Sequence, residues 1–298
     1  MQKVLIWGTG TEYDNYLTLI KFYEEKKQFS VAGVTSNDNY YHTLDGYLFI
    51  QKENIMNIDW DWIVVCANDN TFRSIREEAI SMGISEDVVF SAHIMLLPGF
   101  DFQKYVKLAQ SKLTIFSSNC WGGVVYKRLG LKVRSPLYNM GFDNEYGFLQ
   151  FMSDPKRLLL NEVLQFEENG YNERSKHYYP IYQLAGIRIR MLHDLDRERV
   201  EKKWNERVQR INWDNLFIMM YSDDENCIER FSEMAYEKKV CFTSLNVDIP
   251  YAYHLPLDQV CPGRQLWEIV MSSAKGQYKL YDLMDMLMTG NFNNSRIE

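Results

Sequence analysis

The sequence lacks the long apolar run that a membrane-spanning helix requires. No hydrophobic segment approaches the roughly 18 residues needed to cross a bilayer. The first residues, MQKVLIWG, run from a short apolar segment straight into glycine, without the cleavage-site pattern of a secretory signal peptide. We therefore expect a cytoplasmic protein with no transmembrane segment.

Cysteine is scarce, and its spacing is typical of neither a disulfide framework nor a zinc site. The chain has five cysteines, an odd number, with no Cys-X-X-Cys pair and no Cys/His spacing that suits zinc. Asp59-Trp60-Asp61 has the form of a DXD metal motif, but it precedes an expected strand, whereas such a motif would follow one. We therefore predict a reduced protein without a metal site. The cysteines are Cys66, Cys120, Cys227, Cys241 and Cys261.

Basic residues are also fewer than acidic ones. Lysine and arginine number 33 against 40 acidic residues, which gives a net charge of -7. Such a chain is unsuited to non-specific binding of nucleic acid or anionic lipid. Aromatic residues, by contrast, make up 14% of the chain, and flat rings stack on sugar faces, although most rings simply pack in a core. We expect a small-molecule partner, a carbohydrate or nucleotide sugar, and no nucleic acid.

The first third of the chain alternates apolar strand patterns with helical ones, which predicts a Rossmann-like parallel sheet. Pro98-Gly99 and the polar segment DFQKYVKLAQSK mark the change to a second strand series. We therefore predict an α/β fold with two domains, a Rossmann-like domain at 1–110 and a three-layer α/β/α domain at 111–298. The strands expected in the first domain cover residues 3–7, 29–34, 62–67 and 88–90, and its helices cover 16–26 and 71–82.

A half-complete dinucleotide fingerprint follows the first expected strand. In the sequence GTGTEY, Gly8 and Gly10 occupy the first two glycine positions, but Tyr13 stands where the third belongs. The third glycine allows close packing of helix and strand, so its loss weakens the match. Gly8 and Gly10, with Asn68 at the end of a neighbouring strand, remain candidate cofactor-binding residues.

The acidic residue that holds the ribose of NAD is missing from the end of the second strand. Thr35, Ser36 and Asn37 come first there, and Asp38 follows a few positions late. This disfavours NAD as the cofactor. The cofactor stays open, with a nucleotide or a sugar nucleotide as the possibilities we prefer. A Rossmann unit kept only as a scaffold is the alternative.

A second candidate site follows the expected strand at residues 113–116. The strand leads through a turn into a helix, which places backbone N–H groups and small polar side chains at the carboxyl end of the strand. Two glycines in the turn allow a close approach of the backbone to a ligand. The turn suits a phosphate or sugar hydroxyls. Its candidate substrate-binding residues are Ser117, Ser118, Asn119, Gly122 and Gly123.

Cys120 lies in the same turn, next to a helix N-terminus, where a thiol pKa is lowered. A nucleophile needs a base, and His193 at another strand end is the best candidate, with Asp223 or Asp194 to orient it. The alternative is a structural cysteine. We therefore treat Cys120, His193 and Asp223 as candidate catalytic residues.

Arginine side chains are further candidates for binding a phosphate group of the substrate. Arg188 and Arg190 share one face of an expected strand within residues 180–192, and arginine suits bidentate recognition of phosphate. We take Arg188 as a candidate substrate-binding residue. A solvated strand face explains the same pattern.

Three motifs in fixed order carry a resemblance over roughly the last two thirds of the chain. They are SSNCWGGVVYKRLGL, RSPLYNM and LHDLDRERVEKKWNERVQRINWDNLFIMM. Together they resemble a bacterial family of unknown function labelled exopolysaccharide biosynthesis proteins, here with a nucleotide-binding-type domain in front. The resemblance implies work on cell-surface carbohydrate and supplies no catalytic residues.

We therefore predict a transferase in bacterial cell-surface or exopolysaccharide biosynthesis that uses a nucleotide-activated donor. The sequence leaves open whether a glycosyl, acyl or phosphate-linked group is transferred. The alternative is a non-catalytic regulator that binds a sugar or a nucleotide.

Overall fold

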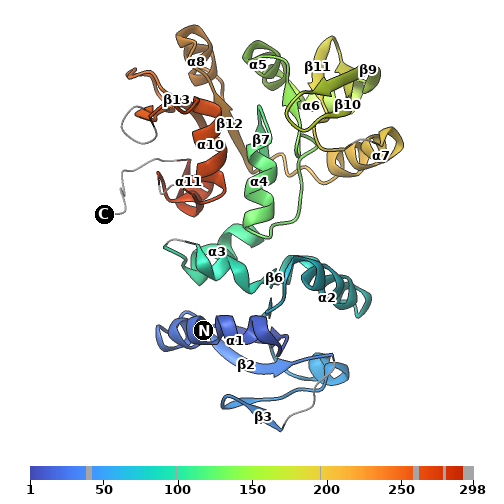
Figure 1. Cartoon of the computed structure of the whole chain (residues 1–298), viewed down its shortest axis with the longest axis vertical. Coiled ribbons are helices and arrows are strands. Elements are labelled where there is room, and N and C mark those ends of the chain that lie inside the picture. Colours follow the sequence, from blue (N-terminus) through green and yellow to red (C-terminus); the bar gives the residue numbers. More distant parts are fainter. Residues whose placement is uncertain (38–41, 98, 195, 258–261, 278–279, 291–298) are drawn as a thin grey trace. The chain divides into compact units, whose positions relative to one another are not determined.

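Parallel β-sheets form the framework of a chain that divides into two units (Figure 1). The structure is a computed structural model that describes residues 1–37, 42–97, 99–194, 196–257, 262–277 and 280–290. Asp38, Pro98 and Cys261 lie outside these ranges. The first unit comprises Met1–Gln110 with Leu129–Lys132, and the second comprises Ser111–Arg128 with Val133–Glu298. The predicted α/β fold class is confirmed.

The first unit is built on a four-stranded parallel sheet of order β2-β1-β5-β6. Its apolar strands are buried, as expected for a parallel sheet with covered faces. The strands are β1 (Lys3–Trp7), β2 (Ser30–Thr35), β5 (Trp62–Val65) and β6 (Val89–Ser91), and the helices are α1 (Thr11–Glu25), α2 (Asp69–Ser81) and α3 (Phe102–Gln110). A small hairpin, β3 (Thr43–Leu44) and β4 (Tyr47–Leu48), and the 3-10 helices η1 (Lys52–Asn57), η2 (Glu86–Val88) and η3 (Ala92–Leu96) complete the unit.

The strand order reverses at β1 and β5. From β1 the chain passes through α1 to β2 on one side, and from β5 it passes through α2 to β6 on the other. The reversal makes the carboxyl ends of β1 and β5 a topological switch point, where open α/β sheets bind their ligands. Trp7 and Val65 are paired at these ends, and Gly8 and Cys66 follow them directly.

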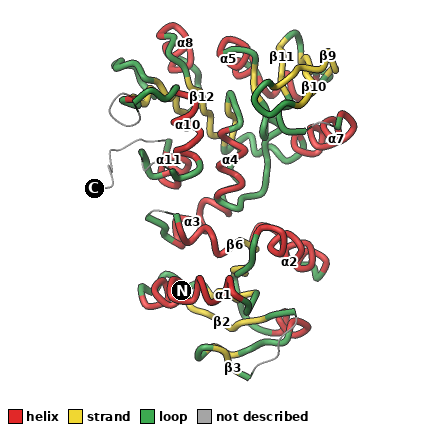
Figure 2. Tube along the Cα trace, in the orientation of Figure 1, coloured by secondary structure: helices red, strands yellow, loops and turns green. Residues whose placement is uncertain are grey.

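The second unit has its own parallel sheet, of order β14-β13-β12-β7. Figure 2 shows the strands of both units in yellow between red helices. The strands are β7 (Thr114–Ser117), β12 (Leu216–Tyr221), β13 (Lys239–Thr243) and β14 (Ala252–His254), and the helices are α4 (Trp121–Arg128), α8 (Glu225–Ser232), α10 (Leu266–Ala274) and α11 (Leu283–Thr289).

An antiparallel sheet of order β8-β11-β10-β9 is added to the second unit. Residues 180–192, expected as one strand, form most of a hairpin, because Ala185 and Gly186 both adopt positive φ, 51° and 81°, and turn the chain. The elements here are β8 (Gly141–Phe142), β9 (Gln165–Asn172), β10 (His177–Leu184), β11 (Ile187–Arg190), α5 (Glu145–Ser153), α6 (Pro155–Asn161) and α7 (Arg197–Val208). The core of the unit includes Phe116 of β7, Tyr182 of β10 and Trp204 of α7, so it draws on both sheets and on the helices.

None of the helices described here is both long enough and apolar enough to cross a membrane. Within the same residues, no group of three His, Cys, Asp or Glu side chains is arranged to hold a metal ion.

Candidate functional site

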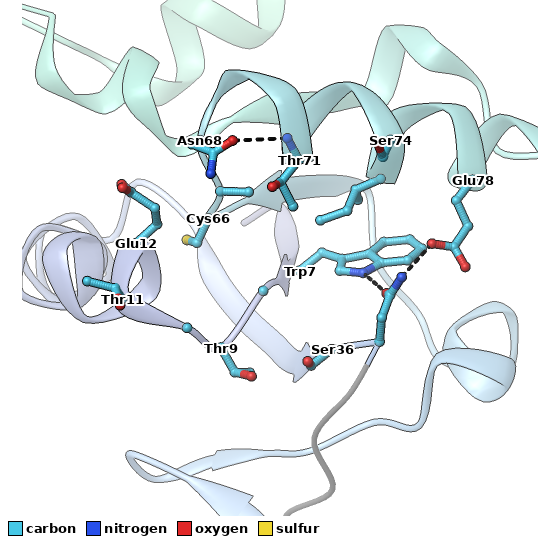
Figure 3. A pocket seen from close by; sticks show the side chains of 15 residues that line it. Trp7, Thr9, Thr11, Glu12, Ser36, Cys66, Asn68, Thr71, Ser74 and Glu78 are labelled. Atoms are coloured by element: carbon cyan, nitrogen blue, oxygen red, sulfur yellow. Dashed lines mark hydrogen bonds between the residues drawn. The ribbon is translucent and has the colours of Figure 1, made fainter.

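A cavity of about 450 Å³ opens at the switch point of the first sheet. Its walls come from residues 7–12, from Ser36 and Asn37, from residues 66–68 and from one face of α2. This volume lies within the ~300–1,000 Å³ typical of small-molecule pockets. Figure 3 shows side chains from these segments arranged around a common space. The expected Gly8, Gly10 and Asn68 all line it.

Gly8 makes the tight turn that the sequence predicts at the end of β1. Its φ is +117°, and a Cβ built there would lie 2.5 Å from the carbonyl oxygen of Cys66. A residue with a side chain would therefore be strained and would collide with the adjacent strand end. Gly8 shapes the cavity floor by bringing the two strand ends together.

Gly10 has a different role, because it is the N-cap residue of α1. A Cβ built there meets nothing within 4 Å, so the glycine leaves open space on the cavity side. The N–H of Tyr13 donates to the carbonyl oxygen of Gly10 at 2.8 Å, and with no side chain to cap the helix, the N–H groups of Thr11 and Glu12 are available to a ligand acceptor. Glu12 also lines the cavity and sets a negative charge beside this turn.

Tyr13, at the third fingerprint position, is a core residue. Its side chain is 1% exposed, and burial, reinforced by Asp45, raises the pKa of its hydroxyl. The small residue that would bring α1 close to the sheet in a dinucleotide-binding domain is thus replaced by a large buried ring.

Asn68 caps α2 at the opposite wall. Its side-chain oxygen accepts hydrogen bonds from the backbone N–H groups of Asn70 and Thr71, each at 3.1 Å. The amide nitrogen is the part of the side chain left to donate to a ligand. Capping explains why an asparagine stands here even without a ligand.

A chain of hydrogen bonds, which the sequence analysis did not identify, closes one end of the cavity. The indole N–H of Trp7 donates to Oδ1 of Asn37 at 2.8 Å, and Nδ2 of Asn37 donates to Oε2 of Glu78 at 2.7 Å. Nζ of Lys52 forms an ion pair with Oε1 of Glu78 at 2.6 Å. Burial acts to raise the pKa of Glu78, but the hydrogen bonds from Lys52 and Asn37 outweigh it and lower the pKa. Glu78 therefore stays ionised at neutral pH.

Cys66 lies at the cavity floor as a protonated thiol. It is 3% exposed, and burial, with Glu12 adding to the effect, raises its pKa to about 12. The side chain is therefore no nucleophile at neutral pH.

In the second unit, the turn after β7 is held by its own hydrogen bonds. Oγ of Ser117 donates to the carbonyl of Asn119 at 2.7 Å and accepts from the N–H of Gly122 at 3.0 Å. Oδ1 of Asn119 accepts from the N–H of Trp121 at 2.9 Å. Ser118 is buried, and its hydroxyl has no hydrogen-bond partner among the residues that the structure describes.

The two glycines of that turn are required by packing. A Cβ on Gly122 would lie 2.7 Å from Oγ of Ser117, and one on Gly123 would lie 2.0 Å from Oδ1 of Asn139. The expected close approach is therefore made by side chains of this protein and leaves no space there for a ligand.

Cys120 is protonated at neutral pH. Its sulfur lies 3.8 Å from the carbonyl oxygen of Met140. Burial raises the pKa of the thiol to about 11, although Arg190 acts in the opposite direction. The effect expected from the adjacent helix N-terminus is thus smaller than the cost of desolvating a thiolate.

Among the described residues, no hydrogen bond or ion pair joins Cys120 to His193 or Asp223. Burial and the neighbouring His177 lower the pKa of His193. Oδ1 of Asp223 accepts from Oγ1 of Thr243 at 3.1 Å and from the N–H of Ser244 at 2.7 Å, so it ties the ends of β12 and β13 together.

Arg188 is surrounded by carboxylates. Its guanidinium forms ion pairs with Asp143 at 2.8 Å and Glu167 at 2.9 Å, and also with Glu168. Its charge is therefore already neutralised within the protein, which favours the solvated strand face over a phosphate contact.

The fold and the cavity define an α/β protein with a pocket at the switch point of its first sheet. The chain belongs to the family described as "Domain of unknown function (DUF1919)", whose model matches residues 92–289. Residues 1–90 match a second model, described as "C2185-like, N-terminal".

A relative from Haemophilus influenzae, which carries the name "Uncharacterized protein", is 31% identical over 140 residues. The match covers 46% of this chain and 64% of the relative. The chain thus spans less than two thirds of the length of that curated relative.

Proposed function

We propose that the chain is a transferase in cell-surface polysaccharide synthesis and that its first unit holds a nucleotide-activated donor. The observation that best supports this proposal is the cavity of about 450 Å³ at the switch point, with the Gly8–Gly10 turn on one side and the N-cap of α2 on the other. The link to polysaccharide rests on the resemblance carried by the motifs of the second unit.

The chemistry of the cavity suits a ligand with both acceptor and donor groups. The first turn of α1 offers backbone N–H groups, which suit phosphate oxygens. Ionised Glu78 offers acceptors at the other end, which suit hydroxyl or amino groups. A nucleoside linked to phosphate and sugar has both kinds of group.

NAD fits this cavity less well than a sugar nucleotide. Tyr13 replaces the third glycine, and Ser36 and Asn37 follow β2 where an acidic residue would hold the NAD ribose. These features support a donor other than a dinucleotide.

One observation favours the alternative, a non-catalytic binding protein. Cys120 is protonated, and Asp223 is occupied by backbone and hydroxyl donors. Among the described residues, the groups that the sequence suggested for nucleophilic chemistry are therefore not joined by hydrogen bonds or ion pairs.

A thermal-shift screen of the full chain tests the proposal. The panel is UDP-sugars, CDP-linked compounds, ATP and NAD, and a sugar nucleotide should raise the melting temperature most. A ligand at 100 times its Kd stabilises the folded state by about 2.7 kcal/mol, which is easily detected. NAD as the strongest stabiliser, or no stabilisation by any nucleotide, would contradict the proposal. Release of free nucleotide from the bound donor would then support a transferase, and binding without product would support the regulator.

A further inference from the structure

Among the residues that the structure describes at the end of β2, Thr35, Ser36 and Asn37 offer no carboxylate of the kind that holds a ribose in many Rossmann-like domains, yet a carboxylate is present at that end of the cavity. It belongs to Glu78, near the carboxyl end of α2, and it reaches Asn37 directly after β2. We infer that Glu78 takes the role of such a ribose-binding carboxylate and selects nucleotides with a free ribose 2′,3′-diol. This inference rests on the proposed function and names the ligand group that the pocket distinguishes.

Glu78 is held in place by two polar partners. Asn37 is fixed by the indole of Trp7, at 2.8 Å, and in turn donates to one carboxylate oxygen of Glu78. Lys52 binds the other oxygen at 2.6 Å. A carboxylate whose two oxygens each hold one protein donor is oriented and still has lone pairs for a ligand. The arrangement is thus prepared to accept two further hydrogen bonds.

The position of Glu78 on α2 directs it to the cavity. Thr71, Ser74, Ile75 and Glu78 are spaced three and four residues apart, so they share one face of the helix. Figure 3 shows Thr71, Ser74 and Glu78 following one another along this wall. Glu77, by contrast, is exposed and does not line the cavity.

The charge of Glu78 decides what it accepts. Although burial opposes ionisation, the hydrogen bonds from Lys52 and Asn37 keep its pKa below the usual value. An ionised carboxylate only accepts hydrogen bonds, so it binds the two ribose hydroxyls and repels a 2′-phosphate. A 2′-deoxyribose would leave one acceptor without its donor, which costs binding free energy.

Titration calorimetry on the full chain tests the inference, with UDP, CDP and their 2′-deoxy analogues as probes. Wild type should bind the better ribonucleotide at least about tenfold more tightly than its deoxy form, as expected for a hydrogen bond to a charged group. Glu78→Gln should lose most of this ratio. Glu77→Gln removes the same charge from the exposed side of α2 and should keep it.

The outcomes separate the inference from the proposed function. Equal binding of ribo and deoxy forms by wild type would overturn the inference and leave the proposed function standing. An unchanged ratio in Glu78→Gln would do the same. If Glu78→Gln folds poorly, a ratio near one measured on wild type would still overturn the inference. Binding of no nucleotide at all would overturn both.

Discussion

Gly8 and Gly10 have different structural roles in the turn after β1. Gly8, at φ +117°, is required by the backbone and by the carbonyl of Cys66, whereas Gly10 has an ordinary φ of -92° and open space around its α-carbon. The sequence predicted both as ligand-binding glycines, and only their surroundings distinguish the one that the backbone requires from the one beside open space in the cavity.

Burial determines the ionisation state of Cys120. Its pKa of about 11 means that the thiolate fraction at pH 7 is on the order of one in ten thousand. We predict that alkylation of Cys120 by iodoacetamide, followed by mass spectrometry, is slow at pH 7 and rises about tenfold per pH unit up to about pH 10. The Cys120→Ser variant serves as the blank. A rate that levels off between pH 7 and 8 would show an activated thiolate and would restore the nucleophile hypothesis.

At the scale of elements, the first residue of β13 is a buried lysine, Lys239, whose side chain caps the C-terminal end of helix α8. Lys239 is 1% exposed, and its Nζ donates to the carbonyl of Ser232 at 2.7 Å and to the carbonyl of Met234. It also lies over the ring of Tyr251, 4.3 Å from the centroid. A cation at these carbonyls satisfies the C-terminal end of α8 and interacts favourably with the helix dipole.

Burial lowers the pKa of Lys239 from 10.5, which predicts a pH-dependent stability. The unfolded chain binds more protons than the folded one between the two pKa values, so this lysine contributes a free energy of unfolding that rises with pH up to about 10.5. In urea titrations, the free energy of unfolding of wild type minus that of Lys239→Met should therefore increase from pH 8 to pH 10. Lys202→Met, an exposed control on α7, should show no such trend. A difference that is constant with pH would contradict the assignment.

The strands of the first parallel sheet and β7 were predictable because they contain short apolar runs, whereas β14, AYH, has no such run and was not predicted. The hairpin of β10 and β11 was not, since Ala185 gives no sequence signal for a positive φ of 51°. The partner strand β9 was not predicted either, because its sequence, QFEENGYN, is largely polar and exposed and lacks the apolar pattern of a buried strand. The local pattern therefore indicates buried strands far better than solvated ones.

The pocket wall shows the same limit for the candidate site. Gly8, Gly10 and Asn68 follow strands directly, so the rule that sites gather at strand ends locates them. Glu78 lies ten residues beyond Asn68 on a charged helix, and Asn37 lies in a different connection. Only the folded sheet brings them to one cavity.

At the scale of the whole molecule, strand order accounts for the cavity at the first sheet. The order β2-β1-β5-β6 reverses direction, whereas β14-β13-β12-β7 runs through the second sheet in one direction. A reversal separates the two flanking connections and opens a crevice between adjacent strand ends. The glycine-rich turn of the second unit, at a sheet without a reversal, is instead filled by Asn139 and Ser117.

The most direct test of the account is the affinity of the Gly10→Ala variant for the sugar nucleotide that best stabilises the wild type. The added methyl group meets no protein atom within 4 Å, so the fold should persist while the methyl group occupies space that the ligand needs. Calorimetry should show affinity reduced at least about tenfold, or ~1.4 kcal/mol. The control is Gly147→Ala in the second unit, where the methyl group makes only ordinary contacts, the nearest at 3.7 Å, and affinity should equal that of wild type. Wild-type affinity in a folded Gly10→Ala protein would contradict the claim that the donor lies at the switch point of the first sheet.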